Sequence, residues 1–357
     1  MVEFDFSGFA GKNILVVGGA GFVGSNLVRM LLKLNTDLHI TVVDNFMSAE
    51  PENLPQHPLL NVIIGSISEE SVLSKINDVY QYIFHLATYH GNQSSIHDPL
   101  ADHAHNTYTT LRLLNHIKDF ENIIKLVYSS AGCSVAKKTF EDAEETTEDA
   151  PLEIRQDSPY SISKIIGEFY SVYFHKQHSV PTVRARFQNV YGPGEILGAG
   201  QWRGTPATIW RNVTPTFIYK SLKNMPMPLE NEGIATRDFI FVEDICRGLM
   251  LCALRGEPGD VYNIGSGVET SIRLLAETIN SITGNAAGIK LLPRRSWDTS
   301  GKRFASIAKS KEKLRFEAQV DLKTGLSITI NWTQENLHFI EQTMHKHSAQ
   351  LKYSIWL

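Results

Sequence analysis

Tyr160 and Lys164 are the two residues whose types and spacing best suit proton transfer. Pro159 precedes them, and proline is common in the first turn of a helix. We therefore expect a helix on which Tyr160 and Lys164, four positions apart, share one face. A lysine ammonium beside a phenol favours the phenolate and lowers the tyrosine pKa, so the pair is a candidate general base near neutral pH.

A glycine-rich segment near the start of the chain has the pattern of a phosphate-binding turn. Residues 14–27 read ILVVGGAGFVGSNL, an apolar run that is interrupted by Gly18, Gly21 and Gly24 and then continues as a helical pattern. This order is typical of a buried strand that turns sharply into a helix, whose first N–H groups and dipole attract a pyrophosphate. The alternative is a tight strand–helix turn that binds nothing.

A second apolar run ends in a carboxylate. Residues 39–43 lead to Asp44, twenty residues after Gly24, and Asn45 follows. A carboxylate at this distance accepts hydrogen bonds from an adenosine ribose and repels a 2′-phosphate. The two features together predict that the ligand is NAD rather than NADP.

The composition is that of an ordinary soluble protein. The 357 residues carry a net charge of −4, which gives no reason to expect nucleic acid as a partner. Cys133, Cys246 and Cys252 are too few for a disulfide framework and fit a reducing cytoplasm. The N-terminal residues lack the pattern of a signal peptide, and no apolar run approaches the roughly 18 residues that span a bilayer. We expect a cytoplasmic protein with no membrane segment and no metal site.

Apolar runs alternate with helical patterns along the first half of the chain. Such alternation predicts an α/β fold with a doubly wound parallel sheet, covered by helices on both faces. The acidic residues 141–149 are expected to form a solvated loop. The expected strands are 14–17, 40–43, 62–64, 82–86, 124–128 and 182–187, with 238–242 as a later return to the pattern.

We divide the chain into a large domain and a smaller lobe. Residues 1–190 form the NAD-binding domain, and residues 235–265 return to it. Residues 191–234 and 266–345 form a smaller, mixed C-terminal lobe for the substrate, and 346–357 form a tail.

At this point the sequence resembles the extended short-chain dehydrogenase/reductases, in their nucleotide-sugar epimerase and dehydratase branch, from about Lys12 to Lys313. The resemblance implies a Rossmann-type sheet and bound NAD. The matching motifs occur in the family's order: GGAGFVG at 18–24, DN at 44–45, HLA at 85–87, YSS at 128–130, YSISK at 160–164, NVYGP at 189–193 and TRDF at 236–239.

The resemblance also implies the site residues. Ser130 would be the catalytic hydroxyl beside Tyr160 and Lys164, and His90, Asn189, Arg237 and Arg303 would bind the sugar nucleotide. The cofactor contacts would come from Gly18, Gly21, Phe22, Val23, Gly24, Asp44, Asn45, Ser66, Ile67, Leu86, Ala87, Thr88, Asn106, Tyr160 and Lys164. Ser66 and Ile67 stand where the family commonly has an Asp-Ile pair at the adenine.

The sequence departs from the family's pattern after the strand at 124–128. Dehydratases have an Asp-Glu pair directly after their catalytic Thr, whereas this chain reads Ser130-Ala131-Gly132-Cys133. Without a gap, the catalytic hydroxyl position falls on Ala131, and an insertion at Gly132 would restore Ser130 to it. Cys133 matches the catalytic Cys of 3,5-epimerases, with His90 as a candidate partner, but a buried small hydrophobe is the simpler interpretation.

We therefore expect an NAD-dependent nucleotide-sugar epimerase that works through a transient 4-keto sugar. A UDP-sugar is the expected substrate and O-antigen synthesis the expected role, because residues 188–215 resemble enzymes of bacterial O-antigen clusters. The alternatives are a C5 or C3/C5 epimerase that uses Cys133, a dehydratase or decarboxylase, and a non-catalytic NAD-binding protein.

The helix that carries Tyr160 and Lys164 is also expected to form a homodimer interface. Residues 165–174 read IIGEFYSVYF, which is apolar around most of the helix, beyond what one buried face requires. Gly167 would permit close approach of the partner helix. The alternative is that the smaller lobe covers this surface.

Overall fold

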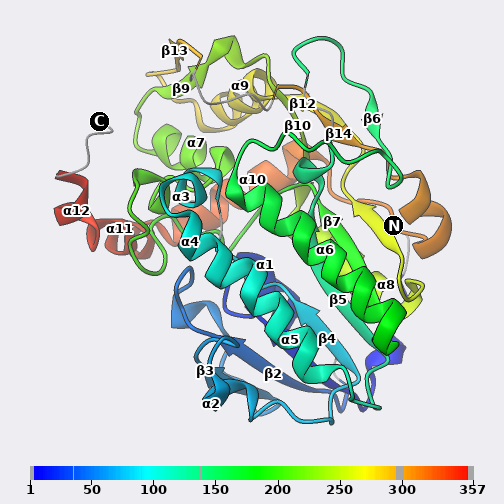
Figure 1. Cartoon of the computed structure of the whole chain (residues 1–357). Helices are drawn as coiled ribbons and strands as arrows, with labels where there is room; N and C mark the ends of the chain where they lie inside the picture. The colour runs from blue at the N-terminus through cyan, green and yellow to red at the C-terminus, as the bar shows by residue number, and fades with distance from the viewer. Residues whose placement is uncertain (1–3, 35, 90, 137–138, 295–300, 353–357) are drawn as a thin grey trace.

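A seven-stranded parallel sheet forms the centre of the protein, with strand order β11-β7-β5-β4-β1-β2-β3 (Figure 1). The structure is a computed structural model that describes residues 4–34, 36–89, 91–136, 139–294 and 301–352. This architecture confirms the predicted Rossmann-type, doubly wound sheet. The strands are β1 (Asn13–Val17), β2 (His39–Asp44), β3 (Leu60–Ile64), β4 (Tyr82–His85), β5 (Lys125–Ala131), β7 (Thr182–Phe187) and β11 (Val261–Ile264).

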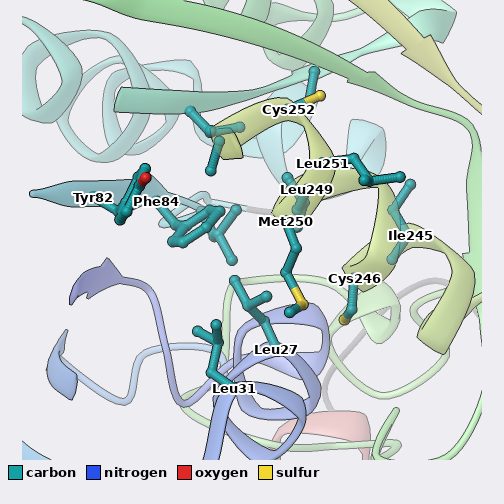
Figure 2. Close-up of a cluster of buried hydrophobic side chains, with 14 of the residues drawn as sticks. Leu27, Leu31, Tyr82, Phe84, Ile245, Cys246, Leu249, Met250, Leu251 and Cys252 are labelled. Carbon is teal, nitrogen blue, oxygen red and sulfur yellow. The ribbon is translucent and has the colours of Figure 1, made fainter. Parts of the chain in front are cut away.

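Helices cover both faces of this sheet because successive strand side chains point to opposite sides. Ile14 and Val16 of β1 lie in one buried cluster, with α1 (Phe22–Leu32) and α8 (Val242–Arg255). Leu15 and Val17 lie in the other, with α2 (Glu70–Leu73), α5 (Thr109–Ile117) and α6 (Pro159–His178). Figure 2 shows the first cluster, where Met250 of α8 points toward Leu27 of α1.

The order of the strands creates a crevice above β1. The chain runs from β1 outward through β2 and β3, and then returns to the other side of β1 as β4. The loops that leave β1 and β4 therefore diverge at their carboxyl ends, and ligands of open α/β sheets bind at such a switch point.

The smaller elements gather at the carboxyl end of the large sheet (Figure 1). Three short sheets contain β8 (Asn189–Tyr191), β10 (Thr236–Phe241) and β12 (Glu269–Ser271); β9 (Met227–Glu230) and β13 (Ile289–Leu292); and β6 (Glu145–Thr146) and β14 (Phe304–Ala305). The remaining helices are α3 (Asn92–His97), α4 (Pro99–Asp102), α7 (Val213–Leu222), α9 (Ile272–Thr283), α10 (Leu322–Glu335), α11 (Leu337–His345) and α12 (Ser348–Lys352). Single turns occur at Ser7–Phe9, Pro51–Asn53, His103–Tyr108, Gly132–Ser134, Pro206–Thr208, Asn231–Gly233 and Ser310–Leu314.

Two segments differ from the sequence-based expectation. β10 pairs with β8 and β12, so it lies outside the large sheet, which is completed by β11. The reason is that β8 begins one residue after β7 ends, outside the large sheet, and β10 pairs with β8 as its parallel partner. Within the acidic stretch 141–149, which we expected to be a loop, β6 forms by pairing with β14.

The outer surface of α6 is partly as expected. Phe169 and Tyr173 are 57% and 53% exposed, whereas Phe174 is buried against the sheet. Gly167 faces inward, because a Cβ there would lie 2.0 Å from the Tyr128 hydroxyl oxygen. The expectation that Gly167 lets a partner helix approach is therefore wrong: its missing side chain makes room for β5. Within the described ranges, every helix is too short or too polar to cross a membrane.

The geometry of the turn between β1 and α1 predicts that alanine substitutions at two of its glycines differ in their effect on stability. A Cβ on Gly24 would lie 2.3 Å from the Gly18 carbonyl oxygen, and backbone atoms cannot turn aside as a side chain can. A Cβ on Gly21 would lie 3.3 Å from that oxygen, at an ordinary φ of −63°. We expect Gly24→Ala to cost about 2 kcal/mol or more of unfolding free energy, and Gly21→Ala clearly less. Urea unfolding of both variants checks this, and equal losses would contradict it.

Candidate active site

The glycine turn forms a cradle at the carboxyl end of β1. Gly18 has a φ of +84°, and a Cβ there would lie 2.4 Å from the Ala87 backbone nitrogen. Gly21 precedes α1 in extended conformation, and Phe22, Val23 and Gly24 form its first turn. The N–H groups of a first helical turn have no partner within the helix. The cradle therefore fits a dinucleotide pyrophosphate without change of the backbone.

Asp44 ends β2 beside this cradle. Its carboxylate accepts hydrogen bonds from the backbone N–H groups of Ala20 and Phe46, both at 2.9 Å. Burial raises the pKa of this carboxyl, and the backbone hydrogen bonds oppose that shift. The Gly21 and Asn45 N–H groups also act on it, so backbone donors hold the Asp44 carboxylate beside the cradle. Asn45 stabilises the next turn by accepting from the Met47 N–H at 3.1 Å.

The other expected cofactor residues lie at the ends of β3 and β4. Leu86 and Ala87 follow β4 directly, against the backbone of Gly18. Ser66 and Ile67 follow β3; the Ser66 hydroxyl accepts from the Ser68 N–H at 3.2 Å, while Ile67 is buried in the core. Ile67 thus forms the floor of this edge of the crevice.

Tyr160 and Lys164 lie in the first turns of α6. Ser158 caps this helix by accepting a hydrogen bond from the Ser161 N–H. The Lys164 ammonium nitrogen lies 5.8 Å from the centroid of the Tyr160 ring and donates to the Ser129 carbonyl oxygen at 2.9 Å. The two side chains therefore share one face, directed at the end of β5.

Burial controls the protonation of this pair. It raises the pKa of Tyr160 far above its usual value, and the neighbouring Cys133 and Asp102 raise that pKa further. Burial also lowers the pKa of Lys164 to about 8, against the influence of Asp102. We expected Lys164 to lower the Tyr160 pKa; in the structure, the loss of solvation outweighs the ammonium. A further positive charge or hydrogen-bond donor is needed before Tyr160 becomes a base near neutral pH.

Thr88 is a direct neighbour of the Tyr160 hydroxyl, a role that the sequence analysis missed. Its side chain is hydrogen-bonded to Tyr160, which lowers the Tyr160 pKa. The Thr88 hydroxyl donates its proton to the Asn106 Oδ1 at 3.0 Å, and that oxygen also accepts from the Tyr89 N–H at 2.7 Å. Asn106 lies in the π-helical turn His103–Tyr108, a type of turn frequent at functional sites. Asn106 therefore positions Thr88 for Tyr160.

Ser130 and Cys133 lie at the end of β5 in different environments. The Ser130 hydroxyl donates to Glu168, whose carboxylate is bound by Arg186 at 2.8 and 2.9 Å. That proton is therefore not available to a substrate oxygen in this structure. Cys133 is half-buried in the turn after β5, and its charge affects the pKa values of both Tyr160 and Lys164. Of these two side chains, only the thiol therefore acts electrostatically on the candidate base.

The expected substrate residues come from separate elements of the lobe. Asn189 begins β8, and Arg237 on β10 donates to the Thr236 and Gly301 carbonyl oxygens, both at 2.6 Å. The Thr236 hydroxyl accepts from the Arg303 N–H at 3.1 Å, which joins the two arginine backbones. His90, the remaining candidate, lies outside the described residues.

A buried carboxyl in the segment after β8 had no signal in the sequence. Glu195 is 5% exposed, and its Oε1 accepts a hydrogen bond from the Asn212 side chain. Its Oε2 has no partner among the residues that the structure describes. Burial raises the pKa of Glu195 to about 7, although Asn212 and the nearby Arg211 guanidinium oppose this shift.

Comparisons with known proteins agree with this geometry. The model of the NAD dependent epimerase/dehydratase family matches residues 14–265. A putative UDP-glucose 4-epimerase of Methanocaldococcus jannaschii is 29% identical over 327 residues, covering 90% of this chain and 99% of its own. The solved structure of Bordetella bronchiseptica WbmF with NAD+ and UDP is 58% identical, with a TM-score of 0.88 over 98% of this chain and 99% of its own. The epimerase Mth375 of Methanothermobacter thermautotrophicus is 35% identical, with a TM-score of 0.85 over 94% and 96%.

The raised pKa of Glu195 predicts a pH-dependent loss of stability. Its folded-state pKa, about 7, exceeds the ordinary Glu value, so the folded protein binds the extra proton and loses stability as the pH rises toward 7. Glu195→Gln keeps the acceptor for Asn212 and cannot ionise. As the pH rises from 4.5 to 8, the unfolding free energy of the variant should increase relative to that of the wild type by up to about 3 kcal/mol. Urea unfolding across this range checks it, with exposed Glu121→Gln as control; a difference that does not change with pH would contradict it.

Proposed function

Because this chain belongs to the NAD-dependent epimerase/dehydratase family, we propose that it epimerises a nucleotide sugar, through a transient 4-keto sugar, while NAD stays bound. One arrangement carries the proposal: Tyr160, Lys164, Thr88 and Cys133 gather beside the glycine cradle. A dinucleotide cradle with a base beside it suits reversible removal of hydride and proton from one carbon.

The residues divide the work at the sugar C4. NAD+, when bound, accepts the C4 hydride and later returns it to the other face. Tyr160 takes the proton of the 4-hydroxyl, and the neighbouring Thr88 hydroxyl stabilises the phenolate once it turns from Asn106 to donate to it. Lys164 provides the positive charge beside the ring, and the Ser129 carbonyl oxygen holds its ammonium in place. Every proton and hydride that leaves the sugar returns to it, so no co-substrate is required.

The residues after β5 favour epimerisation over dehydration. Loss of water from a sugar requires an acid for the departing hydroxyl and a base for the neighbouring carbon. The family's dehydratases place an Asp-Glu pair there, whereas this chain has Gly132 and Cys133. One thiol does not replace two carboxyls.

A UDP-sugar is the proposed substrate. Arg237 and Arg303, joined through Thr236, suit the two phosphates of a nucleoside diphosphate. Two relatives support uridine as the base, since the Methanocaldococcus protein is described as a UDP-glucose 4-epimerase and WbmF was solved with UDP. Synthesis of surface polysaccharide, such as O-antigen, is the proposed role, on the basis of the resemblance of residues 188–215.

A second candidate is inversion at C5, and the position of Cys133 favours it. Its thiol acts on the pKa values of both Tyr160 and Lys164, so it lies at the reacting end of the site. A 4-keto group makes the C5 proton acidic. Cys133 could remove that proton as a thiolate, and reprotonation from the opposite face would invert the carbon. His90 remains the proposed partner.

Tyr160→Phe and Cys133→Ser separate these routes. We expect Tyr160→Phe to lower turnover of the accepted UDP-sugar at least about 100-fold, because the base is lost. If inversion is at C4, Cys133→Ser keeps most activity, and no solvent deuterium enters the sugar. If it is at C5, deuterium enters C5, and Cys133→Ser loses both exchange and turnover.

The assay is NMR of a panel of UDP-sugars in deuterated buffer. Tyr170→Phe, a half-buried tyrosine on the same helix, is the matched control and should turn over like the wild type. Wild-type turnover by Tyr160→Phe, or net loss of water from the sugar, would contradict the proposal.

We also propose that the protein is a homodimer through α5 and α6, which lie side by side on its outer face (Figure 1). Ile162, Phe169 and Tyr173 form an apolar stripe at helical spacing on α6, each about half exposed. A surface of this kind usually marks a partner site, and a two-fold axis lets identical helices cover one another.

Phe169→Glu tests the dimer, because it places a charge in the middle of that stripe. Light scattering at micromolar concentration should give twice the chain mass for the wild type and a monomer for the variant. Leu291→Glu on β13 is the matched control, since Leu291 is also 57% exposed. A monomeric wild type would refute the dimer.

A further inference from the structure

The segment between β8 and α7 crosses over the cofactor side of the crevice. We call residues 193–211 the crossing segment. The Asn26 side chain of α1 donates to the Pro193 carbonyl oxygen at 2.9 Å. The Gln201 N–H donates to the Met47 carbonyl oxygen at 2.9 Å, just beyond Asp44. The crossing segment therefore spans from the first turns of α1 to the loop after β2.

The C-terminal helix holds the other side of the crossing segment. The Thr343 hydroxyl of α11 donates to the Leu197 carbonyl oxygen at 2.7 Å, and the His347 Nε2 lies 2.8 Å from the Gly198 carbonyl oxygen. A Cβ on Gly198 would lie 2.7 Å from the Thr343 carbonyl oxygen, so the two backbones are in close contact. The segment is clamped between the loop after β2 and the end of the chain.

Arg203 brings an uncompensated charge into this clamp. It is 5% exposed, and its Nη1 donates to the Ser48 hydroxyl at 3.2 Å. Its Nε and Nη2 have no hydrogen-bond partner within the described ranges. A buried guanidinium with two idle donors carries a desolvation cost that nothing in the fold offsets.

The nearby charges do not balance Arg203. Arg211 lies close enough that the Arg203 guanidinium helps burial to lower the Arg211 pKa. Among the acids, Glu195 has a pKa of about 7 and is partly neutral at physiological pH. Glu50 is already paired with Lys346. The interior of the crossing segment is therefore net positive, which calls for an anion.

A cavity of about 210 Å³ adjoins Arg203. Its other walls include Met47, Tyr89, His97, Asp98 and His105. The Asp98 carboxylate caps α4 by accepting from the Ala101 N–H and keeps its negative charge, so it offsets part of the positive charge of Arg203 and Arg211.

The place of this cavity in the fold indicates its occupant. Met47 follows the carboxyl end of β2, and Tyr89 follows that of β4. These two strands flank β1, so the cavity opens at the same edge of the sheet as the glycine cradle, and its walls come from the segments on either side of that cradle. In this sheet topology the pyrophosphate of a dinucleotide is held at that cradle.

We propose that Arg203 is a positioning residue for the cofactor, which binds the pyrophosphate of NAD on the side opposite the glycine cradle. The planar guanidinium donates well to two phosphate oxygens, and α11 holds it in place through the crossing segment. NAD is thereby retained between turnovers. The proposal rests on the NAD site and not on which sugar is epimerised.

Arg203→Gln tests this by removing the charge. We expect it to release NAD about 10- to 100-fold faster, as a charged hydrogen bond to phosphate would require. Arg203→Lys keeps the charge without the fork, so its rate should lie between those of Arg203→Gln and the wild type. Thr343→Val removes only the hydroxyl that holds Leu197, and it should speed release a few-fold.

The measurement is the rate at which isotopically labelled NAD replaces the NAD of the isolated protein, with no sugar present. Exposed Arg155→Gln is the matched control and should match the wild type. The affinity for UDP, measured by calorimetry, should not change in any variant. Because Arg203→Lys retains the charge, it keeps the test valid if Arg203→Gln does not fold.

Two results would overturn the proposal. Unchanged NAD release in both Arg203 variants would make this residue structural only. Weaker UDP binding with unchanged NAD release would assign Arg203 to the nucleotide-sugar side. NAD release and UDP binding are both measured without turnover. A negative result for Arg203 therefore does not contradict the proposed epimerisation, and absence of epimerisation would not contradict the role of Arg203.

Discussion

The close approach of the ends of β1 and β4 at Gly18 is the constraint on which the rest of the site depends. With a φ of +84° and no side chain, Gly18 lets the backbone of Ala87 lie against the glycine turn. Gly24 brings the first turn of α1 to the same place. Because these contacts are between backbones, one arrangement positions the phosphate cradle and also Thr88, the hydrogen-bond partner of Tyr160. The cofactor site and the proton-transfer site therefore depend on the same backbone contact between the ends of β1 and β4.

Burial near this backbone contact shifts the pKa values of the two catalytic candidates in opposite directions. It raises the pKa of Tyr160 and lowers that of Lys164 to about 8, so burial disfavours both charged forms, but Lys164 stays mostly protonated at neutral pH. A ligand that carries positive charge beside the phenol shifts Tyr160 toward the phenolate. The nicotinamide ring of NAD is cationic when oxidised and neutral when reduced, so NAD+ bound beside Tyr160 would lower the tyrosine pKa and NADH would not.

The crossing segment brings the C-terminal part of the chain to the cofactor side of the crevice. It connects the loop after Asp44 to α11, so the first and last parts of the sequence meet over the crevice. Its buried Arg203 and half-buried Arg211 make that cover positive, whereas the protein as a whole is slightly acidic. A local excess of charge inside a protein of opposite net charge points to a binding role, because burial of an unpaired charge does not stabilise a fold.

The sequence by itself determined the features that depend on local pattern. Apolar runs between helical patterns predicted the parallel sheet, the glycine spacing predicted the turn after β1, and the spacing of Tyr160 and Lys164 predicted their shared face. Only the tertiary structure decided which groups are desolvated and which distant segments meet. It brought Ser130 to Glu168, turned Gly167 toward Tyr128, and buried Arg203 within a segment held by α11. Those outcomes depend on contacts between residues far apart in the chain. The spacing of residues that are close in sequence does not determine which distant side chains pair or which of them lose contact with solvent.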